Sequence, residues 1–475
     1  MDMEQNKKTP AELLGEKVLF KPENNTILMT DEEIDEAFRY CEGYKTFLDK
    51  GKTEREAVSY AVSLLEERGF SPFDPAVKYQ PGSKVYLANR GKALLFAVIG
   101  KKPLDQGVRI LASHVDSPRI DLKPRPVYEE AQLAMFKTHY YGGVRKYQWV
   151  ATPLALHGVV IKKDGTKVEI VLGEDVGDPV FCITDLLPHL SQEQNKRTLA
   201  DGIKGEELNI LIGSRSFRDD KASEKVKLNI LGMLYEKYGI VEADFLSADL
   251  SLVPAHKALD VGFDRSMLGA YGQDDRVCAY GSLQAALAVE NPAYTTVTVL
   301  ADREEIGSDG NTGLASHFLE DFIADLASPW GIAGRTVLNR SQCLSADVNV
   351  AFDPTFPEVT EKRNTAYLNY GVCLTKYTGS RGKSGTSEAT AEFMGKIRGL
   401  FDREGVLWQT GLLGKVDQGG GGTVAKFIAN LGVDVVDIGV AVLSMHAPFE
   451  VVSKTDVYNM YKGFVSFYKD DSERL

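Results

Sequence analysis

The stretch Thr295–Ser308, TTVTVLADREEIGS, joins a strand pattern to an acidic turn. The residues from Thr295 to Leu300 are β-branched or aliphatic, a composition typical of a strand inside a sheet. The pattern stops at Asp302–Glu305, and Gly307 closes the turn. In α/β proteins the crevice beyond the carboxyl ends of the strands is where ligands bind. This turn is therefore a candidate functional site.

Two interpretations of the carboxylates Glu304 and Glu305 are open. Adjacent side chains at such a turn can point in different directions, so that one binds a cation while the other handles a proton. On this hypothesis Glu305 binds a metal ion and Glu304 is the general base. The alternative is that both are solvated charges at a helix start, where acids suit the N-terminal dipole.

The size and charge of the chain narrow the class of protein. Its 475 residues exceed what one hydrophobic core usually serves, so two domains are expected. The contents of 43% hydrophobic and 26% charged residues are ordinary for a globular protein. A net charge of −12 argues against nucleic-acid or membrane partners, because both require a basic face.

The cysteines and the N-terminal segment indicate a compartment. The five cysteines are widely spread and include no C-x-x-C pair, which favours a reducing cytoplasm over a disulfide framework or a zinc ribbon. The first residues, MDMEQNKKTPAELL, lack the apolar core of a signal peptide. No run of about 18 apolar residues occurs anywhere. We expect a soluble, cytoplasmic protein.

Strand patterns alternate with helical patterns, which predicts an α/β fold with an open, largely parallel sheet. From about residue 126 the pattern changes to short alternating strands, with Asp164-Gly165 as a hairpin turn. We therefore expect an α/β domain of residues 1–127 and 219–475, split by a β-rich insert at 128–218. The expected strands are 85–88, 94–99, 108–112 and 245–252, and the expected helices are one opened by the capping box Thr53-x-x-Glu56, then 224–238, 387–403 and 454–468.

Acidic or imidazole side chains follow a strand or open a helix at five places in the chain. Imidazole and carboxylate groups at one edge of a sheet are ligands for Zn²⁺, Co²⁺ or Mn²⁺. A single histidine there is more often structural, and a single aspartate is more often a helix cap, but the combination favours a metal site. The residues are His114, Asp274, Glu304 with Glu305, Asp347 and His446.

One of these residues, Asp274, and a neighbour of His114, Asp116, suggest more specific roles. Two metal ions about 3.5–4 Å apart would share a bridging carboxylate and activate one water. Asp274, at a helix start, suits that bridge. Asp116, two residues after His114, suits a carboxylate that accepts the second N–H of the imidazole.

The motifs S-H-V-D-S-P-R-I, Q-D-D-R, D-R-E-E-I-G-S, S-A-D-V-N and S-M-H-A-P, in this order, resemble the M18 family of metalloaminopeptidases, the aspartyl aminopeptidase family. The resemblance extends from about Ser113 to Glu450 and includes Tyr141-Gly142-Gly143. It implies a zinc-exopeptidase-like mixed sheet flanked by helices. It also implies that the β-rich insert at 128–218 is a dimerisation domain and that the remainder is the catalytic domain.

The resemblance further implies a centre of two divalent metal ions, Zn²⁺ or else Co²⁺ or Mn²⁺. Glu304 would take a proton from the bridging water, and Asp116 would orient the first histidine. The bond between Asp274 and Asp275 would be a cis peptide. The implied ligands are His114, Asp274 and Asp347 in one half and Asp274, Glu305 and His446 in the other.

Two substrate-side residues are also implied. His189, in the insert, would reach the active site of a neighbouring subunit, with a buried interface histidine as the competing interpretation. Lys376 would contact an acidic substrate side chain, although its spacing from Gly371 is one residue longer than in the family. Members of the family form tetrahedral dodecamers from dimers, so we expect a homo-oligomer that acts on peptides.

The chain departs from the family pattern at TGSRGKSGTSEA and VDQGGGGTVA, which would line the substrate side of the site. Arg381 and Lys383 could supply positive charge there, or could belong to a solvated loop. The glycines of the 419–422 run could bring backbone N–H groups close to a substrate. The expectation of metal chemistry is therefore stronger than that of a preference for Asp or Glu.

These observations together predict hydrolysis of an N-terminal residue, with a possible preference for Asp or Glu, through a water bridging two metal ions. Two alternatives remain open. A deacylase or carboxypeptidase with the same paired metals would share the ligands but differ in its pocket. A non-enzymatic scaffold that binds cargo would be expected to have a broken ligand set.

Overall fold

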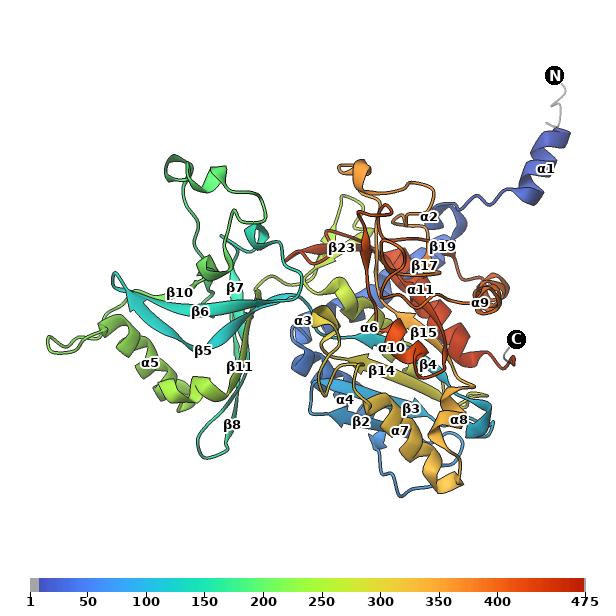
Figure 1. Ribbon diagram of the computed structural model, residues 1–475, viewed down its shortest axis with the longest axis horizontal. Helices are drawn as coiled ribbons and strands as arrows, with labels where there is room; N and C mark the ends of the chain where they lie inside the picture. The colour runs from blue at the N-terminus through green and yellow to red at the C-terminus, as the bar shows by residue number, and fades with distance from the viewer. Residues whose placement is uncertain (1–7, 474–475) are drawn as a thin grey trace.

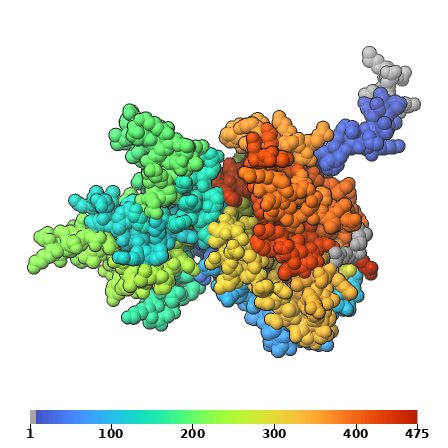
Figure 2. All heavy atoms as spheres, in the orientation of Figure 1, coloured from blue at the N-terminus to red at the C-terminus, as the bar shows by residue number. Residues whose placement is uncertain are grey.

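The computed structural model describes residues 8–473 and has two lobes (Figure 1). The first lobe is built on a nine-stranded sheet and the second on a seven-stranded sheet. Figure 2 shows the cyan and green surface of the second lobe beside the yellow, orange and red surface of the first. The second lobe is therefore formed largely from the middle of the chain, and the first lobe from the segments before and after it.

The sheet of the first lobe is mixed, as expected. Its four central strands, β14, β4, β15 and β21, are parallel, and β3 and β17 pair with them antiparallel. Every residue of β3, β4, β14 and β15 is buried. The strand order is β1 (Ser71–Pro72), β2 (Lys84–Asn89), β3 (Ala93–Val98), β14 (Thr296–Ala301), β4 (Arg109–His114), β15 (Gln342–Ala346), β21 (Asp434–Gly439), β17 (Val372–Thr375) and β19 (Trp408–Thr410).

Helices cover both faces of this sheet because successive side chains of its strands point to opposite faces. On β3, for example, Leu94 and Phe96 join one core while Leu95 and Ala97 join the other. Full burial of one such large side chain contributes about 1.5–3 kcal/mol. The first core includes α3 (Asp31–Lys50), α4 (Glu54–Glu67), α6 (Gln273–Leu287), α9 (Ala391–Glu404) and α11 (Lys454–Lys469), and the second includes α7 (Phe318–Ala327), α8 (Gly334–Leu338) and α10 (Ala425–Ala429).

The smaller elements of the first lobe surround this frame. The helix α1 (Pro10–Val18) projects from the body, and α2 (Asn25–Leu28) follows it (Figure 1). The capping box at Thr53 opens α4, as expected. A five-stranded sheet consists of β12 (Leu259–Val261), β13 (Met267–Ala270), β23 (Glu450–Ser453), β22 (Ala441–Leu443) and β16 (Asn349–Val350), and a two-stranded sheet of β18 (Gly379–Ser380) and β20 (Gly420–Gly421).

The second lobe is an antiparallel sheet with α5 (Lys225–Tyr238) packed beside it (Figure 1). The hairpin at Asp164-Gly165 is confirmed, since Gly165 has a φ of 86° between β7 and β8. The strand order is β8 (Lys167–Leu172), β7 (Leu154–Ile161), β11 (Ala248–Pro254), β5 (Arg119–Glu130), β6 (Leu133–Tyr141), β10 (Ile210–Gly213) and β9 (Cys182–Ile183). These strands begin before residue 128 and end after residue 218, and the division into domains at those positions stays a prediction.

The expected strand at 245–252 is partly wrong. A 3₁₀ helix, Glu242–Ser247, occupies its first part, and the strand begins at Ala248. The carboxylate of Asp244 accepts the backbone N–H of Val241, a local bond that stabilises the turn. Phe245 is buried against Phe136 from this turn, so its apolar side chain did not require a strand.

Within residues 8–473, no helix is long and apolar enough to cross a membrane. All five cysteines are free, and four of them are buried. Burial raises the pKa of the Cys41 and Cys373 thiols to about 12, so these side chains behave as small apolar groups.

Candidate metal centre

The candidate residues meet at the carboxyl edge of the central strands. His114 is the last residue of β4, and it lies in register with Ala301 at the end of β14. Glu304 and Glu305 follow β14 in a single 3₁₀ turn, Glu304–Ile306. Asp347 directly follows β15, Asp274 lies in the first turn of α6, and His446 follows β22. Because parallel strands end at one edge, residues far apart in sequence converge there.

Asp274 lies between the two histidines. Its Oδ1 atom is 3.2 Å from Nε2 of His114, and its Oδ2 atom is 3.1 Å from Nε2 of His446. The Nε2 atom of His446 is also 3.4 Å from Oε2 of Glu305. Asp274 is only 5% exposed. The carboxylate therefore presents a different oxygen to each imidazole.

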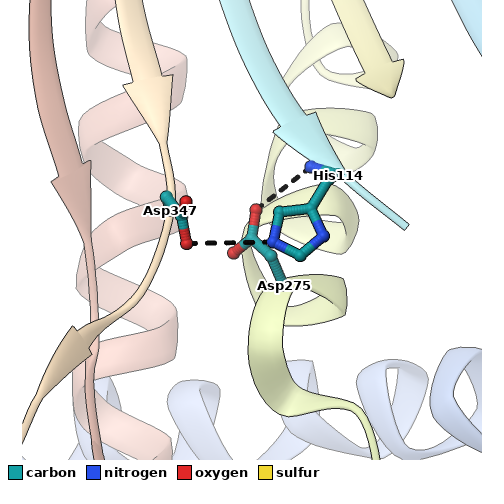
Figure 3. A group of neighbouring side chains, drawn as sticks. All are labelled: His114, Asp275 and Asp347. Carbon is teal, nitrogen blue, oxygen red and sulfur yellow. Dashed lines mark hydrogen bonds and ion pairs between the residues drawn. The ribbon is translucent and has the colours of Figure 1, made fainter. Parts of the chain in front are cut away.

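Figure 3 shows a second group, formed by His114, Asp275 and Asp347. Oδ1 of Asp347 is 3.9 Å from Nε2 of His114, and Asp275 accepts the backbone N–H of His114 at 3.2 Å. Among the described residues, the groups arranged to hold an ion are His114 with Asp275 and Asp347, and His114 with Asp274 and Glu305. The first group contains Asp275, whereas the family resemblance implies Asp274 as the ligand that accompanies His114 and Asp347. Nothing in the sequence indicated Asp275 beyond its position next to Asp274.

Asp116 connects the first histidine to the acidic turn. Its Oδ1 atom is 3.2 Å from Nδ1 of His114 and accepts the backbone N–H of Glu304 at 3.1 Å. Its Oδ2 atom accepts the backbone N–H of Glu305 at 3.2 Å. Asp116 therefore fixes the position of the imidazole and of the turn that presents both glutamates.

Glu450 supports His446 and Asp274 much as Asp116 supports His114 and the acidic turn. It was not predicted from the sequence. It accepts the backbone N–H of His446 at 2.7 Å and that of Asp274 at 3.3 Å. Burial raises the pKa of Glu450 to about 8, with a further contribution from the charge of Asp274. Its position four residues after His446 was the available signal.

The peptide bond between Asp274 and Asp275 is cis, as the family resemblance implies.

The electrostatics of the centre favour bound positive charge. Burial raises the pKa of Glu305 and of Asp347 well above the usual value, with further contributions from Asp274 and Asp275 respectively. Burial also acts to raise the pKa of Asp274, but hydrogen bonds from His114 and His446 outweigh it and lower that pKa.

Two buried carboxylate oxygens at the centre accept no hydrogen bond. They are Oδ1 of Asp275 and Oε1 of Glu305. A buried acceptor without a donor is costly, and a divalent cation satisfies it. Carboxylate oxygens and imidazole nitrogens are the ligands that zinc takes in catalytic sites. The residues present therefore fit a divalent metal ion.

A cavity of about 700 Å³ opens over the centre. It is lined by Glu304, Glu305 and His446 and by the two loops that depart from the family pattern, including Arg381 and Lys383. Lys376 is not part of its lining, and the Lys376 ammonium donates to the carbonyl of Ala389 at 2.8 Å.

Two further residues considered in the sequence, His189 and Asp302, do not belong to the metal centre of this chain. His189 is exposed in a 3₁₀ turn, Pro188–Leu190, of the second lobe and does not line the cavity. Asp302 accepts hydrogen bonds from the backbone N–H of Arg303 and the hydroxyl of Thr312, so its contacts hold the acidic turn together.

Comparison with known proteins places the chain in one family. The family model described as "Aminopeptidase I zinc metalloprotease (M18)" matches residues 47–468. A probable M18 family aminopeptidase 1 of Clostridium acetobutylicum is 49% identical over 445 residues, covering 92% of this chain and 96% of that protein. The crystal structure of an M18 family aminopeptidase from Thermotoga maritima matches with a TM-score of 0.90 and 43% identity, covering 96% of this chain and 100% of that chain.

A more distant structure shares the fold. The S. cerevisiae mApe1 dodecamer matches with a TM-score of 0.73 and 24% identity, covering 92% of this chain and 97% of that chain.

The chain belongs to the M18 family of aminopeptidases. It is a metallo-aminopeptidase, a hydrolase that removes N-terminal residues. The expectation of an enzyme is confirmed, and the alternatives of a deacylase, a carboxypeptidase and a non-enzymatic scaffold are set aside.

Proposed function

We propose that the protein releases the N-terminal residue of peptides at a centre of two divalent metal ions. His114 and Asp347 would hold one ion, His446 and Glu305 the other, and Asp274 would bind both. The observation that carries this proposal is the position of Asp274, whose two oxygens lie 3.2 Å and 3.1 Å from the two imidazoles. A carboxylate placed in this way is what a bridged pair of ions requires.

When bound, the two ions would polarise the scissile carbonyl and lower the pKa of the water that attacks it. Glu304 would act as the general base for that water. Its carboxylate lines the cavity, and Oε2 is 4.0 Å from Nε2 of His114. Burial raises the pKa of Glu304 to about 7; His114 opposes this effect and Asp274 adds to it. A carboxylate whose pKa lies near neutral pH can accept a proton and then return it to the leaving amine.

The chain's own residues would keep this arrangement in place. Asp116 would orient His114 through Nδ1, so that Nε2 faces the centre. The free ammonium of the substrate would lie against the carboxylates around Glu305, which suits an enzyme that acts on the first residue only. The description of the family as zinc metalloproteases supports zinc as the metal, and Co²⁺ or Mn²⁺ would suit the same ligands.

We propose a preference for an acidic N-terminal residue on the basis of cations in the cavity. Arg381 and Lys383 both line it, and no ion-pair partner for Arg381 occurs among residues 8–473. Lys383 is paired with Glu388 at 2.9 Å, so Arg381 is the stronger candidate. Lys376 is 3.8 Å from Glu388 and would need to move to reach a substrate.

The proposed assembly is a homo-oligomer of dimers, with residues 128–218 as the dimerisation domain. Apolar side chains are exposed around His189, namely Leu186, Leu187 and Leu190, and contact with a second subunit would cover them. The mApe1 structure is described as a dodecamer, which supports an assembly larger than a dimer. In such a dimer His189 would complete the neighbouring active site.

Metal stoichiometry tests the proposed centre. The wild-type protein, stripped with a chelator and titrated with Zn²⁺, should bind two ions per chain and recover peptidase activity. D274N should bind fewer than two and lose nearly all turnover, whereas D325N, on the exposed surface of α7, should match the wild type. Full activity with one bound ion would refute the two-metal proposal.

Substrate preference is tested with aminoacyl peptides that differ only in the first residue. If Arg381 recognises an acidic side chain, R381A should lower kcat/KM for the Glu and Asp substrates roughly 10- to 100-fold and leave the Leu substrate unchanged. This range corresponds to one charge-assisted hydrogen bond of about 1.5–3 kcal/mol. An equal loss for all three substrates would contradict the proposed preference.

A further inference from the structure

Tyr141 reaches the metal centre from the second lobe. It is the last residue of β6 and is paired in register with Arg119 of β5. The Arg119 guanidinium lies 4.0 Å from the centre of the tyrosine ring. Arg119 is held in turn by Glu54 at 3.1 Å and by Asp121 at 2.8 Å. The Tyr141 ring therefore packs against Arg119, its partner on the neighbouring strand, and Arg119 is in turn fixed by two ion pairs.

The hydroxyl of Tyr141 donates to Oδ2 of Asp116 at 2.8 Å. Asp116 is 0% exposed. Its other contacts are the backbone N–H groups of Glu304 and Glu305 and Nδ1 of His114. Tyr141 is thus the residue of the second lobe that contacts the Asp116 carboxylate.

The next two residues approach the other half of the centre. The carbonyl of Gly143 lies 3.1 Å from Nδ1 of His446. A Cβ atom on Gly143 would lie 3.0 Å from that same nitrogen. Gly142 has a φ of 75°, and a Cβ atom there would lie 3.2 Å from Cβ of Glu305. Glycine, which has no Cβ atom, permits this approach without crowding either side chain.

We propose that Tyr141 is a positioning residue for the metal centre, acting through Asp116, and that segment Tyr141–Gly143 couples the second lobe to both histidines. A carboxylate that accepts the second N–H of a metal-binding histidine sets the orientation of the imidazole, and loss of such support costs about 10- to 100-fold in metal affinity or activity. Removal of the Tyr141 hydroxyl leaves Oδ2 of the buried Asp116 carboxylate with one donor fewer. This inference rests on the proposed metal centre.

The test compares Y141F with Y140F. Tyr140 precedes Tyr141 on the same strand, and its side chain is exposed, so Y140F removes a hydroxyl that does not face Asp116. Zinc affinity is measured by competition with a chelator, and kcat and KM are measured at saturating zinc. We expect Y141F to bind zinc about 10-fold more weakly than the wild type and to have a lower kcat with KM unchanged. Y140F should match the wild type in each measurement.

Two controls separate the possible failures. The thermal unfolding of the metal-free proteins shows whether Y141F acts through general stability. A lower unfolding temperature with unchanged zinc affinity and kcat would make Tyr141 merely structural and overturn the inference. If D274N binds zinc as tightly as the wild type, the proposed metal centre itself fails. If D274N loses zinc but Y141F does not, only the role of Tyr141 fails.

Discussion

The Nδ1 atom of His157, on strand β7 of the second lobe, lies 2.7 Å from a carboxylate oxygen of Glu56 on helix α4 of the first lobe. The other ring nitrogen of His157 is 3.1 Å from Glu174, which also pairs with Lys52 at 2.7 Å and Lys257 at 2.6 Å. A buried imidazole between two carboxylates thus connects the lobes, and its charge state affects how firmly they are joined.

Stability should fall at alkaline pH because of this histidine. Burial acts to lower the pKa of His157, but Glu174 and Glu56 outweigh it and raise the pKa. A raised folded-state pKa means that the stabilisation is complete below the ordinary pKa, about 6.5, and is lost as pH rises through the folded value. Breaking charge-assisted hydrogen bonds of this kind costs about 1.5–3 kcal/mol.

The measurement is urea unfolding of the wild type and H157Q between pH 6 and pH 9. H157Q should be less stable at pH 6, and the difference should shrink as pH rises. H317Q is the control, since His317 is an exposed histidine paired with Glu320 on the surface. A difference between wild type and H157Q that grows with pH would show that the imidazole is held neutral.

Glu304 and Glu305 should respond differently to the same substitution. E304Q should keep its bound metal and lose turnover by about 10²- to 10⁴-fold, the usual contribution of a general base. E305Q should also lower the metal content, since Glu305 lies 3.4 Å from His446 in the candidate ligand set. Metal analysis and steady-state kinetics of both variants check this.

A third glutamine substitution serves as the reference for this pair. E320Q, on the surface near the start of α7, should leave both metal content and turnover unchanged. The reverse pattern, with metal lost in E304Q and retained in E305Q, would exchange the two assignments.

Removal of metal should lower the thermal stability of the wild type. Asp274, Glu305 and Asp347 are buried carboxylates close to one another, and a bound cation offsets their repulsion. An ion present at 1,000 times its Kd stabilises a protein by about 4 kcal/mol. Calorimetry before and after chelation, and after Zn²⁺ is returned, measures the effect. An unchanged Tm after complete removal of metal would contradict this electrostatic account.

Subunit mixing should show whether His189 acts across an interface. H189A and E304Q should each have little activity alone, but after dissociation and reassociation a mixture should recover it. In a mixed dimer the site with an intact Glu304 receives an intact His189 from its partner, so random pairing predicts roughly a quarter of wild-type activity. Recovery of none, although mixed dimers form, would place His189 outside the neighbouring site.

Much of the frame was predictable from local pattern. The strands around Leu95 and Ile110 consist largely of apolar residues, as strands buried on both faces do, and Asp164-Gly165 has the residues that a tight hairpin needs. Phe245 shows the limit of such patterns. An apolar residue is buried as readily by a 3₁₀ turn as by a strand, so hydrophobicity alone did not place it.

The sequence by itself determined which side chains could form the centre, because a carboxylate or an imidazole at the end of a strand is visible as a residue type in a pattern. Only the tertiary structure decided how those side chains meet. It placed Asp274 between His114 and His446, brought Asp275 beside Asp347, and delivered Tyr141 from another lobe to Asp116. The physical reason is that these contacts join residues far apart in the chain, and their geometry depends on strand register and lobe packing, which no local pattern contains.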